Sequence, residues 1–160
     1  MQSVPNPGRW FRHSVLLAGL FAAAAALTNS PAQAGSCPAD KMAPGVRKPV
    51  SVGSVGESVR VLASVDLAKE FKGGAGRLLR MRYLEIQPGG TVGWHYHGDR
   101  PALIYILDGT IIEYASNCSV PIVHSTGEVS READKLSHWW KNETNKVVRL
   151  LAADVYHVGP

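Results

Sequence analysis

Two histidines, His95 and His97 in the segment TVGWHYH, are the residues of this sequence best placed to do chemistry. In an extended strand, side chains two residues apart leave the same face, so both imidazoles would point the same way. Two imidazoles side by side supply half of a divalent-metal site. The pair alone is a weak signal, because such pairs also lie on solvent-facing strands, so the surrounding residues decide how it is interpreted.

A longer pattern surrounds the pair. From Gly89 to Gly109 the sequence reads GGTVGWHYHGDRPALIYILDG, and from Gly127 to Asn142 it reads GEVSREADKLSHWWKN. The first stretch has a Gly, five residues, His-x-His and a closing Gly, and the second has a Gly, a later His and an Asn. These stretches resemble the two sequence motifs of the cupin superfamily, and the resemblance implies a jelly-roll β-barrel.

The resemblance also implies a site. It adds His138, the histidine of the second motif, to His95 and His97 and places all three around one divalent metal ion. Imidazole ligands suit iron, manganese, nickel, copper and zinc about equally, so the ligand type does not select the metal. Three neutral nitrogens leave the ion with its positive charge, which favours an anionic substrate bound directly to it.

The family's glutamate ligand is missing from its usual position. With six residues before Gly109, that position holds Ala102. Asp99 and Glu113 are the nearby carboxylates that could replace it, although Asp99 also suits a turn and Glu113 a solvated strand. His124 is interpreted as a packed histidine and His157 as a surface residue.

Residues near the histidines are candidates for a substrate pocket. Strand alternation puts Trp140 and Asn142 on the same face as His138 and turns Trp139 outward. Arg80 and Arg82 share a face of an earlier strand and could reach an anionic substrate, although ion pairs at the edge of the sheet are the alternative. The predicted pocket residues are Arg80, Arg82, Ala102, Trp140 and Asn142.

Short strands must position these side chains. Eight segments rich in β-branched, aliphatic and aromatic residues follow one another: SVRVLASVDL, GRLLRMRYLEI, TVGWHYH, ALIYIL, TIIEYAS, VPIVHST, LSHWWKN and VVRLLAADVYHV. The turn residues between them, QPGG at 87–90, DGT at 108–110, TGE at 126–128 and ETNK at 143–146, predict hairpin connections. The fold class is therefore all-β and mostly antiparallel. A helix fits only at ASVDLAKEF, where a bent strand is the alternative.

The start of the chain predicts export. Arg9 and Arg12 precede the uncharged run SVLLAGLFAAAAALTNS, and small residues at Ala32 and Ala34 complete a signal-peptidase site. The predicted organisation is a signal peptide at 1–34, an N-terminal arm at 35–55 and one barrel domain at 56–160. After cleavage no segment for stable membrane insertion remains, and the protein is expected to be periplasmic or secreted.

Charge and cysteines agree with this interpretation. The formal net charge of +4 falls to +2 without Arg9 and Arg12, and no basic run remains, which argues against a nucleic-acid partner. Cys37 and Cys118 are the only two cysteines, and an oxidising compartment favours a disulfide between them.

The leading functional hypothesis is an exported metal-binding cupin that acts as a metal-dependent oxygenase on a small organic molecule. An isomerase or lyase that uses the ion as a Lewis acid stays open. The alternative is a non-catalytic periplasmic binder of a metal ion or small ligand, because no dedicated general base stands out. The resemblance also makes a homodimer the expected oligomer.

Overall fold

The computed structural model describes residues 35–159, so the predicted signal peptide at 1–34 lies outside the described residues. The elements are η1 (Ala39–Lys41), β1 (Val55–Asp66), η2 (Leu67–Lys69), β2 (Arg77–Tyr96), β3 (Ala102–Asp108), β4 (Thr110–Ala115), β5 (Ile122–Ser125), β6 (Val129–Glu132), β7 (Ser137–Lys141) and β8 (Val148–His157). The fold is all-β, as the strand pattern predicts.

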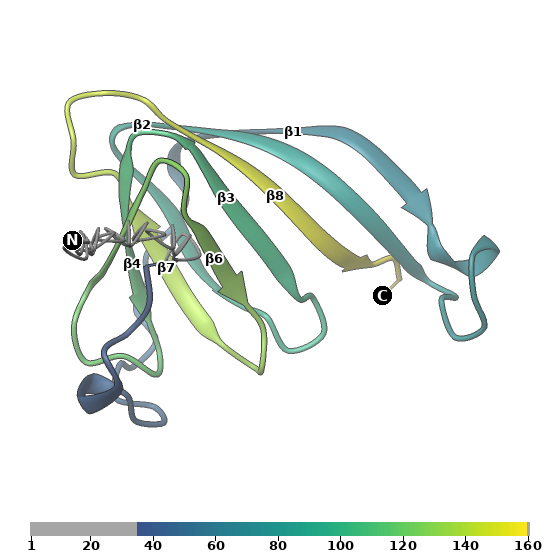
Figure 1. Ribbon diagram of the computed structural model, residues 1–160, viewed down its shortest axis with the longest axis horizontal. Coiled ribbons are helices and arrows are strands. Elements are labelled where there is room, and N and C mark those ends of the chain that lie inside the picture. Colours follow the sequence, from purple (N-terminus) through teal and green to yellow (C-terminus); the bar gives the residue numbers. More distant parts are fainter. Residues whose placement is uncertain (1–34, 160) are drawn as a thin grey trace, which may run out of the picture.

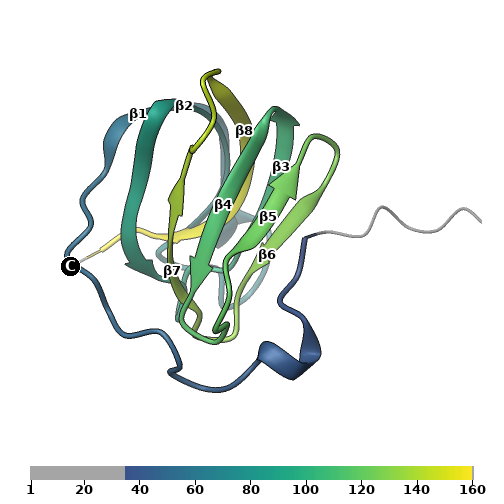
Figure 2. The ribbon, with the colours of Figure 1, turned by 90° about the vertical axis from the view of Figure 1, so that its left-hand side faces the viewer.

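The strands form one antiparallel sheet in the order β5-β4-β7-β2-β8-β3-β6, with β1 added to β2. Strand β2 is shared by both halves of the sheet: its first half pairs with β1 and β8, and its last residues pair with β7. Figure 2 shows the sheet curled into an almost closed barrel. This jelly-roll barrel brings β2 together with β6 and β7, which lie much later in the sequence, around one interior.

Strict alternation separates the inside of the barrel from its outside. In β3, β4 and β8 every second residue is buried. The apolar members form one core: Leu84, Ile86, Ala102, Ile104, Ile106, Ile111, Trp140, Val148, Leu150 and Ala152. Other inward positions carry polar side chains, including His138, Glu113 and Glu132. Because buried polar groups are costly unless they are paired, this polar end of the interior is where a functional site is to be sought.

Three local predictions were wrong. The QPGG segment at 87–90 is not a hairpin turn, because β2 runs through it and two predicted strands are one. Strand β6 was not predicted, since its sequence VSRE has no apolar alternation and its inward residues are Ser130 and Glu132. The α-helix considered for ASVDLAKEF does not form: residues 63–66 end β1, in line with the strand alternative, and Leu67–Lys69 form a single 3-10 turn capped by Asp66.

The segment at 35–54 crosses the barrel surface and is tied to it at both ends. Cys37 and Cys118 form a disulfide with a Cα–Cα distance of 5.7 Å, as predicted. Farther along, Trp94 N donates to Val52 O at 3.0 Å and Gly93 N donates to Ser54 Oγ at 3.0 Å. The arm therefore lies against the part of β2 that carries the His-x-His pair.

A long hairpin made by β1, η2 and the first half of β2 projects from the barrel (Figure 1). It exposes Val59, Val61, Leu62, Val65, Phe71, Leu79 and Met81. The homodimer expected from the resemblance stays a prediction, and this hairpin is the apolar surface that such a dimer could bury.

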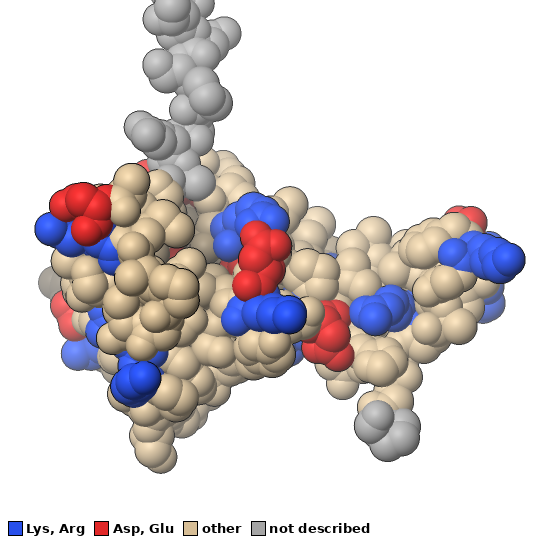
Figure 3. Space-filling model, turned by 90° about the horizontal axis from the view of Figure 1, so that it is seen from below, with Lys and Arg blue, Asp and Glu red and all other residues tan. Residues whose placement is uncertain are grey.

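Charged side chains are scattered over the face drawn in Figure 3, where basic and acidic groups alternate and no continuous basic area is seen. Among residues 35–159, no helix is long and apolar enough to cross a membrane.

Replacing both cysteines (Cys37→Ser with Cys118→Ser) should lower the free energy of unfolding by about 2–4 kcal/mol, because the bridge closes a chain segment of 81 residues. Urea unfolding followed by circular dichroism measures the change. Equal urea midpoints for the oxidised and reduced wild-type protein would contradict the prediction.

Candidate metal centre

Three histidines and one glutamate meet at the polar end of the barrel. His95 on β2 lies directly opposite His138 on β7 in the antiparallel register, and β6 ends at Glu132. One potential ligand atom from each of His95, His97, Glu132 and His138 lies within 4.8 Å of the others. The three histidines that the sequence predicts as ligands are therefore brought together, and a carboxylate joins them.

Hydrogen bonds fix how the three imidazoles are turned. His95 Nδ1 donates to Gly93 O at 2.7 Å, and His97 Nδ1 donates to Arg100 O at 2.7 Å. His138 Nδ1 lies 2.6 Å from Glu113 Oε1. Since carbonyl and carboxylate oxygens only accept, each Nδ1 carries a proton, and each ring points its Nε2 to the centre of the cluster.

The centre is consequently a group of nitrogen and oxygen atoms that face one another. His138 Nε2 lies 3.1 Å from His95 Nε2 and 3.4 Å from Glu132 Oε1. His97 Nε2 lies 3.1 Å from Glu132 Oε2, but among the described residues it has no partner in hydrogen-bonding geometry. Outward Nδ1–H bonds and inward Nε2 atoms are the arrangement found in histidine metal sites, so these residues fit a divalent ion.

Burial controls the protonation of the cluster. It lowers the pKa of His95 to about 3, helped by the neighbouring His138, and lowers the pKa of His97 to about 4. It raises the pKa of Glu132 to about 7. Burial also lowers the pKa of His138, but the nearby Glu132 and Glu113 carboxylates outweigh it and raise that pKa above its ordinary value. His95 and His97 thus stay neutral at pH 7, as metal ligands must.

Glu132 supplies the carboxylate that is missing at position 102. Ala102 on β3 is paired directly with Glu132 on β6, and both side chains are buried. The carboxylate therefore enters the same part of the interior from the neighbouring strand. The structure adds Glu132 to the three predicted histidines as a potential ligand, and the sequence analysis missed it because β6 was not recognised. The available signal was the two-residue spacing of Ser130 and Glu132 inside the second motif-like stretch.

The two carboxylates considered as replacements lie elsewhere. Asp99 is exposed and lies 3.6 Å from His157 on the surface. Glu113 is buried behind the cluster, where Oε1 meets His138 Nδ1 and Oε2 accepts from His124 Nε2 at 2.8 Å. Burial raises the pKa of Glu113, but the hydrogen bonds from His124 and His138 outweigh it, so Glu113 is ionised. Glu113 thus orients His138 and lies outside the group of four.

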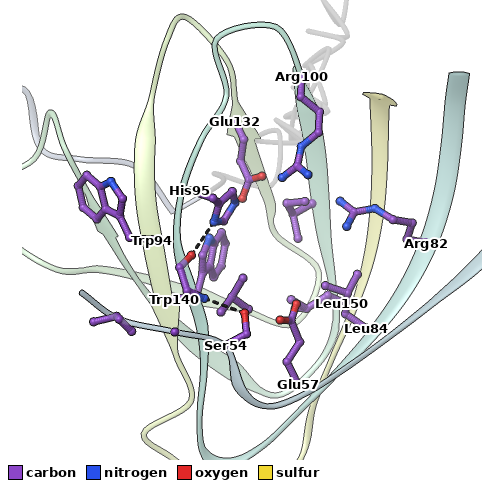
Figure 4. A pocket seen from close by; sticks show the side chains of 15 residues that line it. Ser54, Glu57, Arg82, Leu84, Trp94, His95, Arg100, Glu132, Trp140 and Leu150 are labelled. Carbon is purple, nitrogen blue, oxygen red and sulfur yellow. Dashed lines mark hydrogen bonds between the residues drawn. The ribbon is translucent and has the colours of Figure 1, made fainter. Parts of the chain in front are cut away.

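A cavity of about 400 Å³ opens beside His95 and Glu132. Trp140 forms part of its wall and also stacks on His124, with ring centroids 4.8 Å apart. Val52, Gly53 and Ser54 of the arm close another side. Figure 4 shows the Glu57 carboxylate of β1 turned into the same space, a group that the sequence did not single out.

Two arginines, Arg82 and Arg100, line the cavity next to Glu132 (Figure 4). Behind them lies one buried carboxylate, Asp154, which Arg82 reaches at 3.2 Å and Arg100 at 3.9 Å. Arg80 also binds Asp154, with contacts of 3.0 and 2.7 Å. Three guanidinium groups share this carboxylate, so Asp154 alone does not neutralise them. The buried Nε atoms of Arg82 and Arg100 have no hydrogen-bond partner among residues 35–159.

Of the predicted pocket residues, Trp140 and Arg82 line the cavity. Ala102 is buried in the core beside Glu132, and Arg80 is occupied by Asp154. The Asn142 amide donates to the carbonyls of Ile86, Gln87 and Lys146, so it organises the turn after β7 and is no part of the cavity wall. Trp139 packs outside, stacked on Tyr114 with centroids 4.2 Å apart.

Comparisons with known proteins agree with this fold. The family model described as a cupin domain matches residues 82–154, which contain all four members of the cluster. No curated protein sequence matches the chain.

Two solved structures are among those similar to this chain. One, from Thermotoga maritima, is described as a predicted oxalate decarboxylase: its TM-score is 0.51 at 23% identity, over 75% of this chain and 97% of that one. The other is a cupin-2 domain protein from Rhodospirillum rubrum, with a TM-score of 0.52 at 15% identity, over 71% of this chain and 69% of that one. The family model therefore identifies residues 82–154 as a cupin domain, and the two solved structures, both below 25% identity, show that the fold is that of cupins.

Proposed function

We propose that this protein is an exported, metal-dependent cupin enzyme that binds one divalent ion through His95, His97, Glu132 and His138 and acts on a small organic carboxylate. An oxygenase that uses dioxygen as co-substrate is the reaction class that we favour. The observation that carries the proposal is the cavity itself, in which four potential ligands stand beside two arginines with unsatisfied buried donors.

The ion would supply Lewis acidity toward a coordinated oxygen and, if it is iron, manganese or copper, the capacity to exchange electrons with dioxygen. The chain's own residues orient the ligands, bind the substrate and accept a proton. Glu113 and the backbone carbonyls at Gly93 and Arg100 hold the three imidazoles in one orientation. Arg82 and Arg100 are positioned to bind a carboxylate, since paired guanidinium donors recognise carboxylates strongly. Glu57 is the cavity carboxylate outside the cluster and is available as a proton acceptor.

Periplasmic or secreted localisation is part of the proposal. The signal-peptide pattern at 1–34 motivates it, and the Cys37–Cys118 disulfide supports it, because such bridges persist mainly in oxidising compartments.

The position of the carboxylate gives a direct test of the ligand set. Glu132→Ala should weaken Zn²⁺ or Mn²⁺ binding by more than about 100-fold, beyond the effect of a group that only supports a ligand. Ala102→Glu alone should destabilise the fold, because Ala102 pairs with both Glu132 and Asp154 and a third buried carboxylate would stand between them. Combining Ala102→Glu with Glu132→Ala should recover affinity relative to Glu132→Ala. Competition with a chelator measures all three.

The matched control for this test is Glu70→Ala, at an exposed glutamate of the projecting hairpin and outside the cluster. Unchanged metal affinity in a folded Glu132→Ala variant would remove Glu132 from the proposed ligand set. Failure of the wild-type protein to bind any divalent ion would overturn the metal-dependent function.

Glu113, which contacts His138 from behind the cluster, should also affect metal affinity. Glu113→Gln is expected to lower metal affinity about 10–100-fold, because the amide can no longer accept hydrogen bonds from two imidazoles with a full negative charge. Chelator competition at pH 7 measures the loss, and circular dichroism shows whether the barrel persists. An affinity equal to that of the wild-type protein would contradict a supporting role for Glu113.

Substrate class is tested on the metal-loaded protein with a panel of mono- and dicarboxylates, which includes oxalate because one structural neighbour is described as a predicted oxalate decarboxylase. Calorimetry measures binding, and oxygen uptake with product analysis measures turnover. Arg82→Met should weaken carboxylate binding about tenfold or more, whereas Arg131→Met, at an exposed arginine paired with Asp134, should not. Equal affinity for a carboxylate and its neutral amide would refute anion recognition, and binding without turnover would favour the non-catalytic alternative.

A further inference from the structure

The hydrogen-bond chain behind the metal centre ends at an unsatisfied nitrogen. His138 Nδ1 and His124 Nε2 both donate to Glu113, so the other ring nitrogen of His124, Nδ1, presents a lone pair. His124 is completely buried, and within residues 35–159 its Nδ1 has no hydrogen-bond partner. Buried acceptors without a partner are rare in folded proteins, so this nitrogen calls for a donor.

Gly35, the first described residue, lies over this nitrogen and beside Val123 and Glu128. A Cβ built on Gly35 would lie 2.8 Å from His124 Nδ1, 3.3 Å from Glu128 Oε2 and in contact with Val123 O. These separations are too short for a carbon atom. For a nitrogen that donates hydrogen bonds, 2.8 and 3.3 Å lie at or near the usual lengths.

Gly35 is also the residue that follows the expected signal-peptidase site. When water splits the Ala34–Gly35 amide, the carboxylate leaves with the leader and the nitrogen of Gly35 becomes an ammonium group. That nitrogen is about 1.5 Å from the Gly35 Cα, and no preceding residue then restrains it. Rotation about the Cα–C bond can bring it to the position where the Cβ was built.

We propose that leader removal after Ala34 creates a Gly35 ammonium group that binds in a niche formed by the carbonyl of Val123, Nδ1 of His124 and the carboxylate of Glu128. The three N–H donors of an ammonium match the three acceptors of this niche. Glu128 Oε2 also accepts from Ser125 N at 2.6 Å, which holds the carboxylate in place. In an uncleaved chain the same nitrogen belongs to an amide, which has one N–H and no positive charge.

Binding of the terminus would complete the hydrogen-bond chain that runs through His124 and Glu113 to His138. The Gly35 ammonium donates to His124 Nδ1 and so keeps the proton of that ring on Nε2, where Glu113 needs it. Removal of the leader is thereby linked to assembly of the candidate metal centre, because the uncleaved chain lacks the Gly35 ammonium that donates to His124 Nδ1. The inference needs the barrel and the cleavage site but neither a bound ion nor a substrate.

Competitive acylation of the exported protein tests the niche. The protein is purified after export, its first residue is identified by mass spectrometry, and its amines are labelled with trace acetic anhydride near pH 7, where α-amines react preferentially. The Gly35 amine should react about tenfold more slowly in the wild-type protein than in Glu128→Gln, which keeps an oxygen for Ser125 N but loses the charge. Glu70→Gln, at an exposed glutamate on the projecting hairpin, is the matched control and should react like the wild type.

A second comparison tests the niche without the Glu128→Gln substitution, in case that variant misfolds. A chain that begins at Ala34 should have a freely reactive terminal amine and a melting temperature about 3 °C or more below that of the chain that begins at Gly35. Equal Gly35 acylation rates in wild type and a folded Glu128→Gln variant would overturn the proposal. So would a mature N-terminus at any other residue, or equal stability of the Ala34 and Gly35 chains.

Discussion

The convergence of three imidazole lone pairs and one carboxylate inside an apolar barrel is the constraint on which this structure depends. In a low-dielectric interior such a group of acceptors is unfavourable unless a cation or proton lies among them. The raised pKa values of Glu132 and His138 express the same demand for positive charge. Each Nδ1 atom is held by a carbonyl or by Glu113, so the rings cannot turn away from one another to relieve it.

The barrel holds these polar groups together because side chains alternate between its inside and its outside along each strand. The same inward rows that carry Ile104, Ile106 and Leu150 at one end carry Glu132, Asp154 and His138 at the other. The apolar rows fix the spacing of the strands, and that spacing sets the distances between polar groups that come from different strands. A jelly roll is suited to this because β2 converges with β6 and β7, although three strands separate β2 from them in the sequence. The cavity then opens where the arm, and not a strand, closes the wall.

The sequence predicts the histidine part of this arrangement well. His95 and His97 share a face by strand parity, and the motif around His138 is long enough to be recognised, as is the pair of cysteines. The sequence does not predict the parts of the site that depend on pairing between strands. Glu132 belongs to a strand whose inward residues are polar, so no hydrophobic pattern marks it. Arg80 and Arg82 look equivalent on β2, yet the bidentate contact to Asp154 occupies Arg80, whereas Arg82 also faces the cavity. Such differences arise from distant partners and cannot be read along one segment.

The pairing of Ala102 with Glu132 has a consequence for how sites of this kind are recognised. Two facing positions on neighbouring strands look into the same volume, so a functional group can be exchanged between them while the point in space that it serves is kept. A linear sequence motif records that exchange as the loss of a ligand residue. A description by cross-strand residue pairs records it as a move of the ligand to the facing position. Barrels classified as lacking an acidic residue therefore merit inspection one strand to the side before they are grouped as a separate chemical type.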